Sequence, residues 1–265
     1  MRHITSIASR ELQSLFVSPV AYAVLTLFAV LAGFFFLSSV LQFNEYVMRI
    51  QQFQAFDRLQ EVNLNDYVLS PFLGTMSVVL LFLIPGITMG LFTAEKSNGT
   101  DELLLTSPLT IWDIVFGKFL AAALFVLILV LLLGLFPGIL FFYGDPEIGK
   151  TGAGMLALLL VGLVYAAVGT FASSVTRSQV IAFFLSFVLL LLLWLLSILA
   201  DLGAAGGALG TDTWIAGFLR YVSTAEHFER LQKGLIETSD LAYFGLVIGS
   251  SLLLTKAAVE STRWR

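Results

Sequence analysis

The sequence lacks cysteine altogether and is poor in charged residues and histidine. Without cysteine, the chain cannot form a disulfide framework or a cysteine-ligated zinc or iron–sulfur site. Only 12% of its residues are charged and 58% are hydrophobic, whereas soluble domains carry about 25% charged residues. The two histidines, His3 and His227, lie too far apart in the expected topology to share a metal ion. A net charge of −4 offers no basis for nucleic-acid binding. This composition is typical of integral membrane proteins.

Six apolar stretches are long enough to cross a membrane. A helix needs about 20 residues to span roughly 30 Å of hydrocarbon, and unpaired backbone polar groups are not tolerated in lipid. We therefore expect an all-α integral membrane protein, with a single transmembrane domain over residues 1–265. Its expected spans are 19–42, 70–93, 110–142, 152–173, 180–200 and 240–259. Start signals agree, because Ser18-Pro19 and Ser70-Pro71 each place a capping hydroxyl before a proline, and Thr110 with Asp113 matches a capping box.

The interiors of these spans are expected to be free of Asp, Glu, Lys and Arg. An ion-coupled transporter usually needs such residues, and a membrane-embedded enzyme would need clustered histidines or carboxylates. Both classes are therefore disfavoured. Three glycine pairs with small-xxx-small spacing predict close helix packing within the chain. These pairs are Gly86/Gly90, Gly134/Gly138 and Gly245/Gly249.

Six spans place both termini on one side of the membrane, which we take to be cytoplasmic because of the Lys and Arg distribution. The inner face then holds Arg2, Arg10, Lys96, Lys118, Arg177, Lys256, Arg263 and Arg265. Residues 1–17 have the periodicity of an amphipathic helix on the inner membrane surface; the alternative is the cytoplasmic end of a tilted first span. The expected outer segments are 43–69 and 201–239, and the inner connections are the loop 94–109 and the turn 174–179.

A formal Walker A pattern covers residues 144–151. A genuine phosphate-binding loop follows a buried strand and opens a helix, whereas this segment follows an apolar helix on the expected outer side. Asp145 and Glu147 would also repel a phosphate. We interpret the match as a coincidence and expect no ATP site and no enzymatic activity in this chain.

The inner loop between the second and third spans carries the most informative residues. Thr100 can cap a short helix whose first turn holds Asp101 and Glu102 at the positive end of its dipole. Three leucines follow, and Ser107-Pro108 ends the helix. Leucines outside the membrane must be buried, either against the protein's own inner helices or in a groove on a cytoplasmic partner.

Residues 93–118, with Gly99-Thr100, the Glu102-Leu103-Leu104 run, Ser107-Pro108 and Gly117-Lys118, resemble permease subunits of the ABC-2 superfamily. The resemblance extends over the whole chain. Its amino terminus (Arg10-Glu11-Leu12, then Ser18 to Tyr22) and its outer segment (Ser223 to Phe244) look like the gliding-motility-type, GldF-like or NosY-like branch.

The resemblance implies half of a type V-like transporter, an exporter in the bacterial cytoplasmic (inner) membrane. It implies three partners: a separate ATP-binding subunit that holds the ATP and Mg²⁺, a second permease chain, and a GldG-like auxiliary protein. No cofactor is expected on this chain itself. By analogy, the coupling residues are Glu95, Gly99, Thr100, Glu102, Leu103, Leu104, Pro108 and Arg177, and Arg10 and Glu11 belong to a connecting helix. The alternative function is a membrane scaffold that transports nothing.

Overall fold

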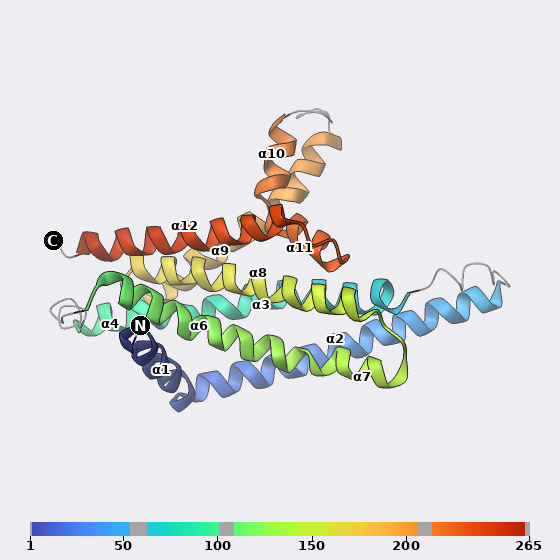
Figure 1. The fold of residues 1–265 in the computed structure, drawn as a ribbon, viewed down its shortest axis with the longest axis horizontal. Helices are drawn as coiled ribbons and strands as arrows, with labels where there is room; N and C mark the ends of the chain where they lie inside the picture. The colour runs from blue at the N-terminus through green and yellow to red at the C-terminus, as the bar shows by residue number, and fades with distance from the viewer. Residues whose placement is uncertain (1, 54–62, 101–108, 206–213, 263–265) are drawn as a thin grey trace.

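The computed structural model of the protein describes residues 2–53, 63–100, 109–205 and 214–262. Within these ranges all regular secondary structure is helical (Figure 1). Six helical segments in them are long and apolar enough to cross a membrane: Pro19–Gln52, Asn65–Asn98, Ile111–Tyr143, Ile148–Val175, Gln179–Leu202 and Thr238–Ser261. The expected all-α class and number of spans are confirmed.

Several of these segments consist of more than one helix. The described helices are α1 (Arg2–Val17), α2 (Pro19–Gln52), the π-helical turn η2 (Asn65–Leu69), α3 (Ser70–Thr88), α4 (Gly90–Asn98), α6 (Ile111–Leu133), α7 (Leu135–Tyr143), α8 (Ile148–Val175), α9 (Gln179–Ala205), α10 (Trp214–Val222), α11 (Thr224–Gln232) and α12 (Thr238–Thr262). The start of α1, the end of α12 and α4 lie toward one end of the bundle, and α7 lies at the other (Figure 1).

Two of the three predicted helix starts are confirmed. The Ser18 hydroxyl accepts a hydrogen bond from the Val20 amide at 3.3 Å, with Pro19 in the first helical turn. Thr110 and Asp113 form a reciprocal capping box. The third prediction is wrong, because η2 runs directly into α3 and Ser70 already has helical backbone angles. The polar turn at the start of η2 is held by other contacts, so no cap is needed at Ser70.

Helix α8 lies at the centre of the bundle and packs against α3, α6, α9, α11 and α12. Close approach depends on its glycines, because a Cβ at Gly162 would come 2.5 Å from Val126 Cγ1, and one at Gly169 would come 2.0 Å from Thr88 Oγ1. Of the three predicted glycine pairs, only Gly134 approaches another helix closely, with an added Cβ 3.2 Å from Met155 Cε of α8. A Cβ at Gly138 or Gly245 would meet no described atom within 4 Å. Spacing along the sequence does not say which helix face meets a neighbour.

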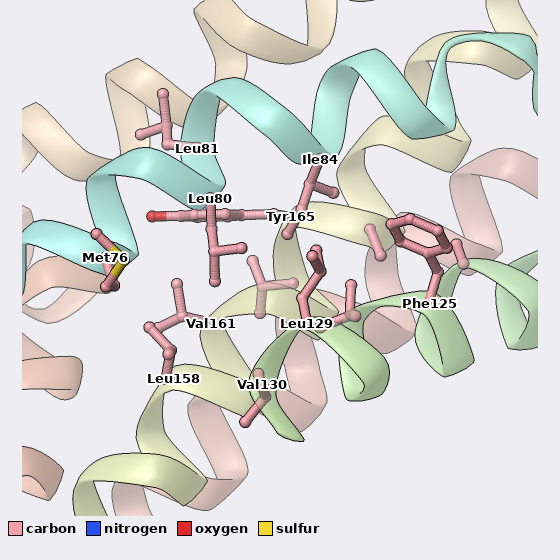
Figure 2. Close-up of a cluster of buried hydrophobic side chains, with 14 of the residues drawn as sticks. Met76, Leu80, Leu81, Ile84, Phe125, Leu129, Val130, Leu158, Val161 and Tyr165 are labelled. Carbon is pink, nitrogen blue, oxygen red and sulfur yellow. The ribbon is translucent and has the colours of Figure 1, made fainter. Parts of the chain in front are cut away.

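The core is a continuous apolar cluster between α3, α6 and α8 (Figure 2). Its labelled residues are Met76, Leu80, Leu81 and Ile84 of α3, Phe125, Leu129 and Val130 of α6, and Leu158, Val161 and Tyr165 of α8. In contrast, α2 and α9 leave most of their apolar surface uncovered by the described chain. Apolar helices of this kind are suited to contact with lipid or with another membrane chain.

Candidate functional site

Three helices meet at one buried cation, Lys118 of α6. Its Nζ atom donates to Glu11 Oε1 of α1 at 3.0 Å, to Glu95 Oε1 of α4 at 2.9 Å and to the Leu91 carbonyl at 2.6 Å. The Lys118 side chain is 1% exposed and each carboxylate side chain 17% exposed. An ammonium group has three protons to donate, and all three have acceptors here. We call Lys118, Glu11 and Glu95 the lysine node.

A glycine next to Lys118 lets α1 reach this node. An added Cβ at Gly117 would lie 2.7 Å from the Cβ and Cγ2 atoms of Ile7. The apolar face of α1 therefore packs directly on α6, and the Phe16 ring lies 5.9 Å from that of Phe125. The opposite face of α1 is exposed, including Arg10, whose guanidinium lies 3.9 Å from Glu95. Packing on α6 satisfies the apolar face; contact of α1 with a membrane surface stays a prediction.

Helix α4 ends beside the node. Gly99 adopts a left-handed conformation at φ 68°, and the Thr100 amide then donates to the Glu95 carbonyl at 3.0 Å. Lys96 donates to the Ser174 carbonyl, which joins α4 to the last turn of α8. Arg177 is exposed in the following turn between α8 and α9. The two segments expected to face an ATPase thus lie close together.

The structure brings together Arg10, Glu11, Glu95, Gly99 and Thr100 from the expected set. The other expected coupling residues of the inner loop, Glu102, Leu103, Leu104 and Pro108, lie outside the described residues.

The sequence placed Lys118 and Asp240 at the ends of spans, but did not predict that both side chains are fully buried among neighbouring helices. Lys118 was therefore missing from the expected site. It precedes the long charge-free run, so hydropathy placed it at a span end, whereas neighbouring helices bury it. The signal that could have found it is the Gly117-Lys118 pair.

The Walker-like segment lies at the other end of the bundle (Figure 1). It follows helix α7, not a strand, and Lys150 lies 3.8 Å from Asp66 and 3.4 Å from Glu147. The Glu147 amide donates to Asn65 Oδ1, and Thr151 Oγ1 accepts from Asn65 Nδ2. A phosphate would need the backbone amides, the lysine and the threonine hydroxyl of this segment. Here the Glu147 amide, Lys150 and Thr151 instead bind η2, which supports the interpretation of the Walker A match as a coincidence.

A second polar cluster joins α11 to α12. His227 Nδ1 lies 2.6 Å from Asp240 Oδ1, and Nε2 lies 2.8 Å from the Tyr221 carbonyl. Arg230 donates to the same Asp240 oxygen at 2.8 Å, and the Tyr243 ring stacks on the imidazole at 3.9 Å. The described residues contain no group of three metal-ligating side chains. Both ring nitrogens of His227 are engaged, one by Asp240 of α12 and one by the Tyr221 carbonyl of α10, so the cluster holds α10, α11 and α12 together.

Comparison with known proteins agrees with these features. Residues 5–259 match the family described as ABC-2 family transporter protein. No curated protein sequence matches the chain.

Proposed function

The chain belongs to the ABC-2 transporter family as a membrane-spanning permease subunit, and from this premise we propose that it is half of an exporter driven by a separate ATP-binding subunit. Permeases of this family act with an ATP-binding cassette partner, and the transmembrane subunit is typically not the catalytic one. We further propose that the partner docks at the end of the bundle that carries α4.

The lysine node carries this proposal. A docked ATPase can drive transport only if its conformational change also moves the membrane-spanning helices. This requires rigid contacts between the docking segment and those helices. Residues 101–108 follow directly after α4, whose Glu95 is tied through Lys118 to both α6 and α1. Because a buried ion pair has few alternative partners, breaking it is costly, about 3–5 kcal/mol. A displacement of α4 is therefore expected to move α1 and α6 with it.

The mechanism follows from this connection. ATP and Mg²⁺ bind to the partner, and its closure pulls on the leucine-bearing segment at Leu103 and Leu104. Helix α4 continues into α3 within one spanning segment, Asn65–Asn98, so the pull tilts α3 together with α6. Lys96 extends the same movement to α8 through Ser174. Arg177, exposed beside Ser174, makes the second contact with the ATPase.

The finer features of the assembly belong to this proposal as well. Two permease chains pair in a type V-like transporter of the bacterial inner membrane, with both termini in the cytoplasm. Helix α1 serves as the connecting helix along the membrane. The branch is the GldF-like or NosY-like one, with a GldG-like auxiliary protein as a further partner. The order of motifs along residues 10–22, 93–118 and 223–244 supports this assignment.

Association with the ATPase tests the proposal. The full chain is co-expressed with the ATP-binding subunit from the same genome, and the copurified ATPase is quantified. Replacing Leu103 and Leu104 with Asp should lower the association about tenfold or more, because charged residues cannot fill an apolar groove. The matched control replaces the exposed pair Leu235 and Ile236, between α11 and α12, with Asp and should leave the association unchanged.

Unchanged copurification of the Leu103/Leu104 variant would contradict the docking assignment. A label at Gly99 that reacts only from the outer side would contradict the orientation. An intact complex with envelope proteins but no ATPase would favour the scaffold alternative.

A further inference from the structure

An open cavity of about 800 Å³ lies between α3, α8, α9 and α11. Its apolar part includes Val79 and Phe82 of α3 and Trp194 of α9, and its polar rim includes Asp66, Glu229 and Lys233. Phe82 and Ile198 line it although they are 53% and 41% exposed, so the cavity opens through the side of the bundle. Its volume lies within the range of small-molecule sites, about 300–1,000 Å³.

One polar group inside this cavity has no partner among the described residues. Tyr165 of α8 is 1% exposed and lines the cavity, and no described side chain or backbone group hydrogen-bonds its hydroxyl. Figure 2 shows the ring extending from α8 beneath α3, with the oxygen directed toward the stretch that carries Met76 and Leu80. The hydroxyl oxygen is not among the fully buried side-chain atoms that lack a partner, so it faces the open space of the cavity. A molecule bound there can accept its hydrogen bond.

Three other hydroxyls of the cavity are already engaged. Ser77 donates to the Gly74 carbonyl at 2.7 Å, Thr75 to the Pro71 carbonyl at 2.9 Å, and Thr224 pairs with Tyr243 at 3.1 Å. The Tyr165 and Ser70 hydroxyls are the lining hydroxyls without a described partner. Tyr165 is the one held inside the bundle, so we take it as the group that orients a bound molecule.

The rim offers charges of both signs. Glu229 and Lys233 form no ion pair with any described residue, and Asp66 shares Lys150 with Glu147. An ammonium group fits the two rim carboxylates, and a phosphate fits Lys233. Aromatic and aliphatic side chains together with exposed charges of both signs in one cavity match an amphiphile that carries a zwitterionic headgroup.

We propose that this cavity binds a zwitterionic phospholipid, with an acyl chain along Val79, Phe82 and Trp194 and the headgroup at Glu229 and Lys233. Tyr165 donates a hydrogen bond to an ester oxygen of the lipid. A second copy of the chain would fit less well, since a packed apolar helix would neither accept the hydrogen bond of Tyr165 nor pair with the charges of Glu229 and Lys233. The step from binding to export rests on the proposed function, whereas the binding itself does not.

Photo-crosslinking of the full chain tests the site. The protein is placed in phosphatidylglycerol nanodiscs that contain a small fraction of phosphatidylethanolamine with a diazirine in one acyl chain, and the labelled peptides are quantified. We expect label on the peptides that contain Val79 and Trp194. Tyr165→Phe removes only the hydroxyl and should lower the labelling about fivefold, the equivalent of one hydrogen bond.

Two glycines of α3 give a matched pair of variants. An added Cβ meets nothing within 4 Å at either Gly74 or Gly86, but only Gly74 lines the cavity. Gly74→Leu should therefore fill the cavity and reduce the labelling fivefold or more, and Gly86→Leu should leave it unchanged. Equal labelling of wild type and Gly74→Leu would overturn the proposal.

Two further experiments distinguish the proposed lipid from an anionic lipid and from a second copy of the chain. Equal labelling by a phosphatidylglycerol probe would overturn the zwitterionic headgroup. The chain has no cysteine, so Ile198→Cys supplies a unique thiol at the mouth of the cavity. Its oxidation to a disulfide-linked dimer would place a second copy there and overturn the lipid. Normal lipid labelling without ATPase association would refute the proposed function but not the lipid site. ATPase association without lipid labelling would refute the lipid site but not the proposed function.

Discussion

Replacing Lys118 with Met tests whether the lysine node holds the bundle together. The substitution keeps an unbranched side chain of similar length but removes the cation that Glu11 and Glu95 share. Removing one partner of a buried ion pair costs about 3–5 kcal/mol. Both carboxylates are 17% exposed and regain some hydration, so we expect about 3 kcal/mol, the lower end of that range.

Thermal unfolding of the detergent-solubilised chain measures this loss. At roughly 2–4 °C per kcal/mol for a chain of this size class, Lys118→Met should lower Tm by roughly 6–12 °C. The matched control is Lys256→Met, at the same end of the bundle. Its ammonium pairs with Glu260 at 3.1 Å, but both side chains are partly exposed, 30% and 42%. Such an i,i+4 pair contributes about 0.3–0.5 kcal/mol.

A compensating variant separates charge from packing. Adding Glu11→Gln and Glu95→Gln to Lys118→Met removes the two carboxylates that had shared the buried ammonium group. Because a buried ion cluster can often be replaced by neutral residues at little cost, the triple variant should recover at least half of the lost Tm. A Tm for Lys118→Met within about 2 °C of wild type, less than 1 kcal/mol, would refute the structural role of the node.

Three further substitutions probe separate features. Gly117→Ala places a methyl group 2.7 Å from Ile7 and should destabilise the chain by about 1–3 kcal/mol through overpacking. Limited proteolysis should then cleave α1 more readily. The control Gly138→Ala, whose Cβ meets nothing within 4 Å, should leave the cleavage of α1 unchanged. Lys150→Ala removes only partly exposed ion pairs, so it should cost at most about 1 kcal/mol of stability and leave the association with the ATPase intact. Loss of nucleotide-dependent activity in this variant would instead support a nucleotide site at residues 144–151. Asp240→Asn removes the buried carboxylate that pairs with His227 and Arg230, and should lower the free energy of unfolding by about 3–5 kcal/mol, measured by thermal unfolding. A smaller loss of stability than for Lys150→Ala would contradict this prediction.

The polar cluster between α11 and α12 shows what a local sequence pattern does not reveal. The sequence Ser223-Thr224-Ala225-Glu226 matches a capping box at the start of α11. The Ser223 hydroxyl, however, makes no cap hydrogen bond and is buried without a partner among the described residues. The helix is held instead by His227, whose contacts with Asp240 and the Tyr221 carbonyl span α10 to α12. A sequence pattern identifies the helix start correctly here while assigning its stabilisation to the wrong group.

The sequence alone determined the six spans, the helical class and the family motifs. Hydropathy over about 20 residues is a local property that the bilayer converts directly into a helix. The capping box at Thr110 and Asp113 is local in the same way. The resemblance over residues 93–118 also grouped Glu95, Gly99 and Thr100, which lie together because they are neighbours in sequence.

Only the tertiary structure decided which charges and glycines face each other. Lys118 and Glu11 are 107 positions apart, and no periodicity within either helix reveals that they meet. The same holds for Gly169 and Thr88: a small residue permits close approach, but the angle and rotation of two packed helices decide whether it is used. Burial of an ionisable group depends on all the helices around it, so the lysine node and the Tyr165 cavity appear only once the bundle is assembled.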